Sequence, residues 1–450
     1  MLALIEPHAF NKTLKIPPSK SHTIRRLLMA ALTDGVSHIT KPLVSADTQS
    51  CIAACRAIGA EIIEEHNNNS CENIWTVRGN RKNAGAVQHC IDAGNSGTTL
   101  FFAIAAAALF SQPITFTGDR QNAGRSAGPL LDALAGLGVN VSSRDGCIPI
   151  TVCGPWKGGR ITLPCPTSQY LSALLLAAPL APEGTVTEVD VPLLNEKPYI
   201  TMTLAYLKSQ GLFGDESDNS KIISNADYSY FRIQGGNTYT PLNDHVPGDF
   251  SSAVFPAAAA VLSGGKAVLS GLDPNDTQGD KIFFEYISQM GCEVQWENKN
   301  ADWQVTVSRA NPLRGGIFDL NDTPDLIPIM AVLGAFAKGE TILTNAAHAR
   351  IKETDRIAVM AEELRKLFGG VNNFRCGEKP DGLILQGVGT EPAAANAGSI
   401  TLDGRGDHRV TMAMACAALG MPAGTKVIIS GAEAADISYP GFWEMIEECF

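Results

Sequence analysis

The chain has 450 residues, which is long for one domain and comfortable for two. Hydrophobic residues make up 45% of it and charged residues 18%, so the chain has enough apolar material for sizeable cores and is not expected to be disordered. Acidic residues exceed basic ones by 46 − 35 = 11, which disfavours a nucleic-acid or anionic-membrane surface, because phosphate groups select basic footprints. A local basic pocket for a small anion is compatible with this charge.

The cysteines indicate a reducing compartment. There are 11, an odd number, with no CxxC pair and no Cys/His cluster at zinc spacing, and we expect nearly all of them to be buried free thiols. The first residues show no basic segment followed by a long apolar one, and apolar runs such as 101–110 are too short to cross a bilayer. The expectation is a cytoplasmic protein.

A repeat runs along the chain. Six segments rich in Ala, Leu and Met are nearly apolar all round, which is typical of buried helices. Each is followed by a turn, usually at a glycine, and then by a short alternating β-type run. In most copies a second helix follows and ends at a glycine before a strand. The six segments are Arg26–Thr33, Leu100–Ser111, Leu171–Pro182, Ala253–Ser263, Leu326–Lys338 and Val410–Ala418.

Six copies fit two halves of three α/β units. The third copy degenerates near 210–230, and the polar stretch 237–249 is a candidate linker before the fourth copy. A second crossing is expected near 16–20, where two prolines stiffen the chain. We therefore predict an α/β fold with a first lobe of residues 20–245, a second lobe of 1–19 plus 246–450, and a ligand-binding cleft between the lobes. A repeat array without catalysis is the alternative that periodicity leaves open.

Polar motifs open three of the apolar segments in the first half. Lys20, Ser21 and Arg25 lie in PSKSHTIR, where free N–H groups and the helix dipole favour an anion. Gly94-Asn95-Ser96-Gly97-Thr98-Thr99 allows close approach of its backbone to an anion, although it is no Walker loop. The triplet 167–169 adds two hydroxyls and an amide. An ordinary helix cap is the alternative for each motif.

The second half repeats this pattern. Residues 352–356, KETDR, form its densest charged run, and Lys352 and Arg356 are spaced to share a helical face. Asp325 precedes an apolar segment, and Arg409 opens the last one. A solvated salt-bridge face is the usual alternative. If the helix starts of both halves converge, they gather a set of cations suited to a small polyanion: Lys20, Arg25, Arg125, Lys352, Arg356 and Arg409.

Several strings occur together and in order through nearly the whole chain. They include PSKSHTIR, AGNSGTT, GDRQNAGRSAGPLLDAL, TSQYLSALLLAAPLA, KPYI, VPGDFSSA, TPDLIPI, IKETDR and GDHR. Together they resemble the enolpyruvyl transferase family, and within it the 5-enolpyruvylshikimate-3-phosphate synthases. The resemblance implies two lobes of three βαβαββ-type units each. It also implies transfer of the carboxyvinyl group of phosphoenolpyruvate to the 5-hydroxyl of shikimate 3-phosphate, without a metal or cofactor.

The resemblance also assigns roles to residues. It implies Asp325 as proton acceptor, Glu353 as a candidate proton carrier and Lys20 as a group serving both ligands. It implies phosphoenolpyruvate contacts at Gly97 and Arg125 and a clamp on that ligand in the second lobe. The full set of implied substrate contacts is Lys20, Ser21, Arg25, Gly97, Arg125, Thr167, Ser168, Gln169, Asp325, Lys352, Arg356 and Arg409. The resemblance implies that the two small substrates are the only partners, without nucleic acid or membrane. It also implies that the protein is a monomer.

Four positions depart from the family pattern. Ile437 stands where a clamp lysine is common, and Glu196 stands where Ser precedes Lys-Pro-Tyr. His348 replaces an Asn and Phe101 an Arg. A lost lysine and an added carboxylate both weaken anion binding. A diverged transferase with a related acceptor, or a weakened protein that only binds phosphorylated ligands, is therefore an alternative, although binding alone has no need of proton carriers such as Asp325 and Glu353.

Overall fold

The chain forms two compact units. The computed structural model describes residues 1–67, 72–80, 88–214, 220–299, 302–389 and 399–447. Unit 1 consists of Met1–Ser19 and Pro247–Phe450, and unit 2 of Lys20–Val246. The buried hydrophobic side chains form two clusters, one within each unit. Each unit thus has a core of its own.

The described part of unit 2 contains three four-stranded sheets with one common pattern. The first strand pairs in parallel with the second, which pairs antiparallel with a third, and the fourth strand lies outside the third. The sheets are β14(Asn243–His245)-β3(Asp34–Thr40)-β5(Glu72–Asn80)-β4(Glu61–Asn67), β6(Cys90–Asp92)-β7(Ile114–Thr117)-β9(Cys147–Cys153)-β8(Asn140–Arg144) and β10(Gly159–Thr162)-β11(Val186–Asp190)-β13(Tyr230–Gln234)-β12(Ile222–Ser224).

In its described residues, unit 1 repeats this pattern, with its last sheet one strand shorter. Two of its sheets borrow a strand from the N-terminal segment. The sheets are β2(Asn11–Lys15)-β15(Lys266–Ser270)-β17(Asp302–Ser308)-β16(Glu293–Lys299), β18(Ile317–Asp319)-β19(Lys338–Thr344)-β21(Gly382–Val388)-β20(Arg375–Lys379) and β22(Ser399–Asp403)-β23(Lys426–Ser430)-β1(Leu2–Ile5).

The six predicted apolar helices are confirmed. Each is followed by a strand, as the repeat requires: α1(Lys20–Ala31), α3(Gly97–Ala107), α6(Gln169–Ala177), α8(Phe250–Ser263), α10(Ile327–Phe336) and α12(His408–Leu419). The other helices in the described ranges are α2(Ala46–Ala57), α4(Arg120–Ala123), α5(Gly128–Gly136), α7(Lys197–Ser209), α9(Phe283–Gln289), α11(Arg356–Leu367) and α13(Phe442–Ile446). Single 3₁₀ turns are η2(Ala178–Leu180), η4(Gly279–Ile282), η5(Pro324–Leu326), η6(Ala347–Ile351) and η7(Ala432–Ile437).

Two details of the predicted repeat are wrong. The third copy is not degenerate, because α7, β12 and β13 complete it. The stretch 237–249 is more than a linker, because its β14 pairs in parallel with β3 and completes the first sheet of unit 2. All three residues of β14 are exposed, so they show no apolar alternation that would mark them as a strand.

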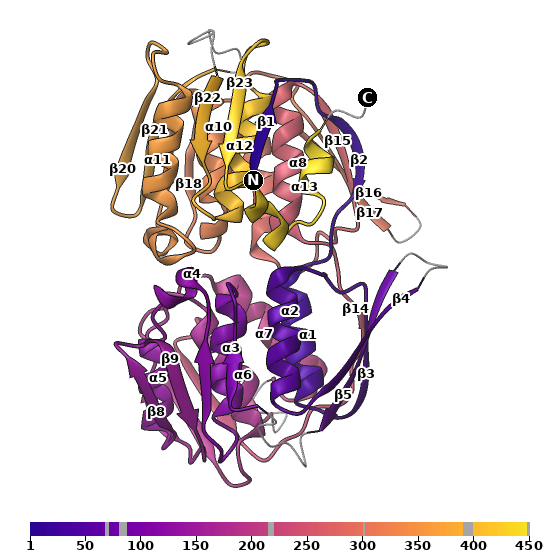
Figure 1. Ribbon diagram of the computed structural model, residues 1–450, viewed down its shortest axis with the longest axis vertical. Helices are drawn as coiled ribbons and strands as arrows, with labels where there is room; N and C mark the ends of the chain where they lie inside the picture. The colour runs from indigo at the N-terminus through magenta and orange to yellow at the C-terminus, as the bar shows by residue number, and fades with distance from the viewer. Residues whose placement is uncertain (68–71, 81–87, 215–219, 300–301, 390–398, 448–450) are drawn as a thin grey trace. The chain divides into compact units, whose positions relative to one another are not determined.

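The apolar composition of the six helices follows from their place in each unit. In unit 1, α8, α10 and α12 pack against one another, with the sheets outside them (Figure 1). Every residue of α10 is buried, which explains why it is apolar on all faces. In unit 2 the sheets likewise lie outside α1, α3 and α6 (Figure 1). Polar groups therefore concentrate at the helix ends.

The cysteine expectation is partly confirmed. Six of the free cysteines that the structure describes are buried, but Cys90 is exposed and Cys147 and Cys153 are half-buried. Among the described residues, no helix is long and apolar enough to span a membrane.

Candidate active site

Lys20 opens α1 and meets a carboxylate within unit 2. Its ammonium Nζ lies 2.8 Å from Oδ2 of Asp47, in the first turn of α2. Both side chains are largely buried, with 17% and 7% of their surface exposed. The backbone carbonyl of Asp47 in turn accepts a bond from the Thr99 hydroxyl at 3.4 Å. The starts of α1, α2 and α3 are thus tied together around one cation.

Arg25 is buried one turn further along α1. Its Nε donates to Thr203 Oγ1 at 2.9 Å and its Nη2 to the carbonyl of Tyr199 at 3.2 Å, both on α7. The guanidinium also lies over the ring of Phe102, and Nη1 donates to the carbonyl of Ser21 at 3.1 Å. Burial lowers the pKa of Arg25 to about 10, so it stays charged at neutral pH. Arg25 is a buried, hydrogen-bonded cation rather than a surface base.

The glycine of the GNSGT motif makes room for an arginine. A Cβ on Gly97 would lie 2.1 Å from Nη1 of Arg125, so only glycine lets that guanidinium rest against the first turn of α3. Beside it, Nε2 of Gln169 donates to Thr98 Oγ1 at 3.1 Å and links the starts of α6 and α3. The predicted groups on α3 and α6 therefore come together in unit 2.

The donor groups of Thr167 and Ser168 bond to another side chain of the same unit. Oε2 of Glu196 accepts from Thr167 Oγ1, from Ser168 Oγ and from Ser168 N, each at 3.0 Å. Glu196 precedes α7 and is 1% exposed. The departure from the family pattern at Glu196 thus touches the predicted hydroxyl pair directly.

In unit 1, Arg356 lies at the centre of three carboxylates. Its Nη1 is 2.7 Å from Asp325 Oδ1, its Nη2 is 2.6 Å from Glu353 Oε2, and its Nε is 2.8 Å from Asp407 Oδ2. A further bond of 3.3 Å joins Nη2 to Asp407 Oδ1. Arg356 is 1% exposed, so these bonds form away from solvent. The carboxylates around Arg356 raise its pKa well above the usual range, although burial alone would lower it.

Arg409 shares Asp325 with Arg356. Its Nη2 lies 2.9 Å from Asp325 Oδ2, and its Nη1 lies 3.9 Å from Oδ2 of the buried Asp280. Burial alone would raise the pKa of Asp325, but Arg409, Lys352 and Arg356 outweigh it and hold this pKa well below the usual range. The predicted second-half residues therefore form one cluster, with Lys352 close enough to act on Asp325.

Burial shifts the neighbouring carboxyl in the opposite direction. Desolvation raises the pKa of Asp280 to about 6, with smaller contributions from the negative charges of Asp325 and Asp249, while Arg409 acts against the rise. The Ser251 hydroxyl donates to Asp280 Oδ2 at 2.5 Å. Asp280 is thus a buried acid that titrates near neutral pH beside an arginine.

Three acids of this site were missed from the sequence. Asp47 and Asp280 stand in no motif, and nothing in the chain order places them beside Lys20 or Arg409. Asp407 is different: it directly precedes α12 and its Oδ1 accepts from Arg409 N at 2.9 Å, the bond of a helix cap. Its position before an apolar segment was a readable signal for the cap, but not for its contact with Arg356.

The comparisons with known proteins agree over the whole length. The family model of EPSP synthase (3-phosphoshikimate 1-carboxyvinyltransferase) matches residues 5–446. The chain belongs to the EPSP synthase family. A 3-phosphoshikimate 1-carboxyvinyltransferase of Acetivibrio thermocellus is 42% identical over 100% of this chain and 98% of its own. One of Halobacterium salinarum is 38% identical over 99% and 98%.

Solved structures give the same family and a wider fold group. The EPSP synthase of Acinetobacter baumannii has a TM-score of 0.77 at 26% identity, covering 99% of this chain and 97% of its own. The enolpyruvyl transferase NikO of Streptomyces tendae has a TM-score of 0.71 at 17% identity, over 99% and 96% of the two chains, and shows the fold alone. The predicted two-lobed α/β fold of this EPSP synthase family member is therefore confirmed.

The other departures from the family pattern lie in ordinary surroundings. Phe101 is buried and meets the ring of Tyr170 edge-on, with centroids 5.0 Å apart. His348 is buried, and its Nε2 lies 3.0 Å from the carbonyl oxygen of Asn321. Ile437 is half-buried at the end of η7, which packs against α12. The apolar Ile437 thus belongs to a segment that packs on α12, the helix that carries Arg409.

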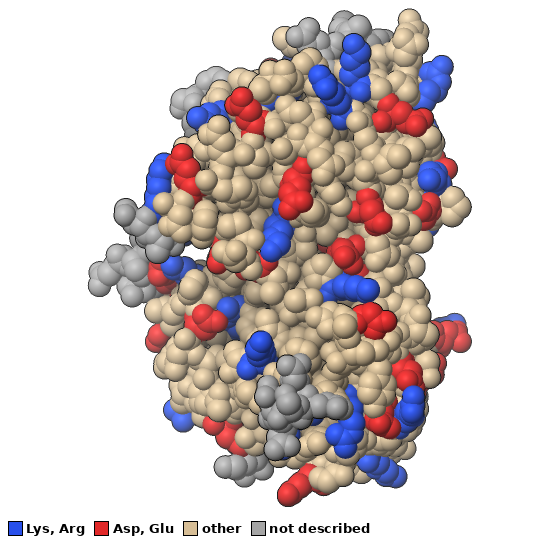
Figure 2. Space-filling view, turned by 180° about the vertical axis from the view of Figure 1, so that it is seen from behind, with Lys and Arg blue, Asp and Glu red and all other residues tan. Residues whose placement is uncertain are grey.

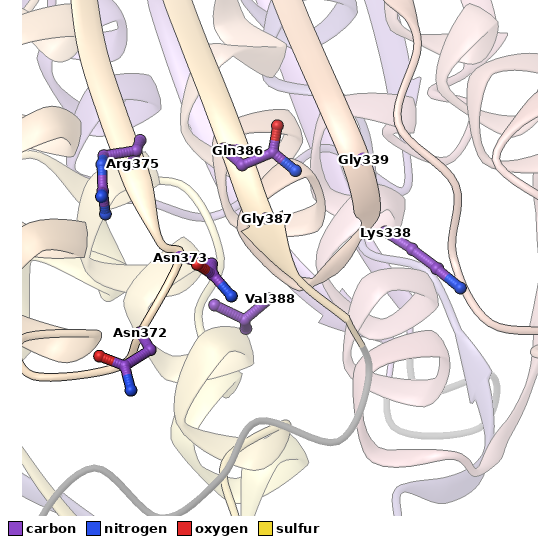
Figure 3. A pocket seen from close by; sticks show the side chains of 8 residues that line it. All are labelled: Lys338, Gly339, Asn372, Asn373, Arg375, Gln386, Gly387 and Val388. Carbon is purple, nitrogen blue, oxygen red and sulfur yellow. The ribbon is translucent and has the colours of Figure 1, made fainter.

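A separate pocket lies at the other end of one sheet. Its volume is about 490 Å³, and its lining includes Lys338, Arg375 and Gln386 (Figure 3). Lys338 begins β19, whereas Asp325 and Glu353 follow the ends of β18 and β19, so the pocket lies at the opposite edge of the sheet. Its two basic side chains lie on opposite sides and do not converge (Figure 3). It is a shallow surface feature and no part of the candidate site.

Charges on the surface are mixed. On the face shown in Figure 2, basic and acidic side chains are interspersed, and no large area carries basic ones alone. Three cations of the candidate site, Lys20, Arg356 and Arg409, are instead largely buried and paired with acids.

Proposed function

We propose that this member of the EPSP synthase family transfers the carboxyvinyl group of phosphoenolpyruvate to the 5-hydroxyl of shikimate 3-phosphate and releases phosphate. The reaction belongs to chorismate and aromatic amino acid biosynthesis. The observation that carries the proposal is the cluster in which Asp325 is shared by Arg356 and Arg409, with Glu353 on the same guanidinium. Fixed cations beside carboxylates suit a reaction that must hold anionic substrates and move protons.

The chemistry needs three proton movements. The enol carbon of phosphoenolpyruvate takes up a proton, which makes the neighbouring carbon electrophilic, and the 5-hydroxyl loses its proton as its oxygen bonds to that carbon. The added proton then leaves as the carbon–oxygen bond to phosphate breaks, so the double bond is restored. We assign these transfers to Asp325, Glu353 and Lys20 as catalytic groups.

The remaining groups bind the substrates. We propose substrate contacts in each unit, because each unit alone carries only part of the set that the family pattern requires. The proposed contacts in unit 2 are Lys20, Ser21, Arg25, Gly97, Arg125, Thr167, Ser168 and Gln169. Those in unit 1 are Asp325, Lys352, Arg356 and Arg409. Arg409 is the stronger candidate for an anion contact, because Arg356 already donates to three carboxylates.

Phosphate release tests the activity directly. Purified protein is given phosphoenolpyruvate with and without shikimate 3-phosphate, and inorganic phosphate is measured. We expect release only when both are present, with an equal amount of the enolpyruvyl product. Release without the acceptor, or binding of both substrates without any turnover, contradicts the proposal.

Ile437 tests the phosphoenolpyruvate contact. A cation that bonds an anionic ligand contributes about 1.5–3 kcal/mol, or roughly one to two orders of magnitude in affinity. Ile437→Lys should therefore lower the KM for phosphoenolpyruvate by about tenfold or more, with little effect on shikimate 3-phosphate. Titration of both ligands against both proteins checks this. An unchanged or higher KM for phosphoenolpyruvate means that position 437 does not face that ligand.

The pH dependence tests Asp280. Its pKa is raised to about 6, so it is neutral below that pH and anionic above it, where it competes for Arg409. We expect the KM for phosphoenolpyruvate of the wild type, divided by that of Asp280→Asn, to rise as the pH passes through about 6. The ratio removes the titration of the ligand, which both proteins share. A ratio that does not vary between pH 5 and 8 contradicts this role for Asp280.

We propose a cytoplasmic monomer whose partners are its two small substrates, with neither nucleic acid nor membrane. Light scattering of the purified protein at micromolar concentration tests the monomer. A mass of two or more chains contradicts it.

A further inference from the structure

A carboxylate of the chain fills the group of donors at the start of α6. Oε2 of Glu196 accepts three hydrogen bonds of 3.0 Å, from the hydroxyls of Thr167 and Ser168 and from the backbone N–H of Ser168. All three residues are less than a tenth exposed. Buried donors that converge on one oxygen are the arrangement with which proteins hold an oxyanion. Here the oxyanion is internal.

The backbone of Glu196 adopts an unusual conformation. Its φ of 59° and ψ of 42° are left-handed, directly before Lys197 and Pro198 at the start of α7. That conformation costs free energy for any residue with a Cβ, so the contacts of the side chain help to maintain it. The charge also acts on its neighbours: burial raises the pKa of Cys165 to about 12, and Glu196 adds to the rise. Glu196 is therefore a defined part of the site and not a loose surface acid.

We propose that Glu196 is a tethered competitor for the phosphate of the acceptor and thereby determines acceptor selectivity. The proposal rests on the proposed function, in which Thr167 and Ser168 contact the substrates. We place the phosphate of shikimate 3-phosphate at these two residues, because their two hydroxyls and one N–H converge on a single anionic oxygen. The two hydroxyls and the N–H cannot donate to Glu196 Oε2 and to a phosphate oxygen at once. A carboxylate and a phosphate that both lay beside these donors would also repel each other. Phosphate binding therefore requires the Glu196 carboxylate to leave the three donors.

A consequence follows for ligand choice. Only a ligand with a phosphate at this point has to displace the Glu196 carboxylate. The carboxylate therefore weakens the binding of shikimate 3-phosphate and leaves the binding of shikimate unchanged. A serine in its place, as the family pattern has, removes the competing charge and adds one donor. The chain thus distinguishes the phosphorylated acceptor from the unphosphorylated one less sharply than a serine-bearing site does.

Two variants measured with two ligands test this. Calorimetric titration gives the Kd of shikimate 3-phosphate and of shikimate for the wild type, Glu196→Ser and Glu196→Gln. We expect Glu196→Ser to bind shikimate 3-phosphate about tenfold more tightly or better, with shikimate unchanged. Glu196→Gln keeps an oxygen for the three donors but loses the charge, so it should fall between. Because the donors hold the phosphate in the ground state and in the transition state alike, kcat should change little.

A matched control separates the effect from net charge. Asp190→Asn removes an exposed carboxylate of the same unit, paired with Arg160 at 2.8 Å, and should leave both affinities unchanged. Thermal unfolding confirms that each variant is folded. Shikimate 3-phosphate binding that does not tighten in either Glu196 variant, or tightening shared equally by shikimate, overturns the proposal. Failure of the proposed function shows separately, as absence of acceptor-dependent phosphate release by the wild type.

Discussion

Replacement of Asp325 with alanine should lower kcat by about 10²–10⁴-fold, the usual contribution of a group that carries a proton in the transition state. The affinity for shikimate 3-phosphate should change far less, because the loss falls on the chemical step. Asp325 lies 2.7 Å from Arg356 and 2.9 Å from Arg409, so alanine also frees two cations. Asp325→Asn keeps the shape and one acceptor oxygen for them and should lose kcat to a similar extent.

The low pKa of Asp325 sharpens this prediction. A carboxylate stabilised by Arg409, Lys352 and Arg356 is a weak base as it stands. An anionic substrate that bonds to Arg409 draws that cation away from Asp325, so the pKa of the carboxyl rises when the substrate is bound. We therefore expect kcat of the wild type to stay constant down to a pH set by the substrate-bound state, above the pH at which Asp325 titrates in the free protein.

The control for Asp325 lies three residues away. Asp322 is exposed, so Asp322→Asn removes a charge near Asp325 in the sequence and should keep normal turnover. Steady-state kinetics of the three variants, with both substrates varied, provide the comparison. Near-normal kcat in Asp325→Ala contradicts the proton-transfer role, and an equal loss in Asp322→Asn assigns the effect to long-range charge.

The repeat was readable because its signals are local. The six helices carry long runs of Ala, Leu and Met, and turns separate them from strands with visible alternation. The pairing of strands that lie far apart in the sequence could not be predicted. β14 has three exposed residues, and β1 and β2 lie more than two hundred residues from their partners β23 and β15. Pairings of that kind depend on the whole fold, and no window of sequence contains them.

The site was predicted in part for a related reason. Motifs at helix starts identify the basic and hydroxyl groups, because those positions face away from the core. Their acidic partners come from elsewhere: Asp47 from α2 to Lys20, and Glu196 from the start of α7 to Ser168. Spacing along the chain cannot show such pairs. It is these partners that decide how much of each cation or donor is left for a ligand.

Arg356 should matter more for stability than for substrate binding. Four of its donor contacts go to Asp325, Glu353 and Asp407 at 1% exposure, so its removal leaves three largely buried carboxylates without this shared partner. Removal of one partner from a buried charge network costs about 3–5 kcal/mol. Arg356→Gln should therefore lower the melting temperature of unit 1 by on the order of 10 °C. Calorimetry measures this, and Arg405→Gln, an exposed arginine paired with Glu362, is the control and should change little.

Acidification separates the two roles of Arg356. In the wild type the pKa of Asp325 is depressed, so its contribution to stability is present above its unfolded pKa and is lost as the pH falls. In Arg356→Gln, Asp325 loses one of the cations that hold its pKa down, so this pKa is less depressed and the variant has less stability to lose as the pH falls. The difference in melting temperature should therefore stay constant from pH 7 to about pH 4 and shrink as the pH falls below the unfolded pKa of an aspartate, about 3.9. A variant that melts like the wild type at pH 7, with only its KM for phosphoenolpyruvate raised, would instead make Arg356 a ligand clamp whose carboxylate contacts contribute little to the fold.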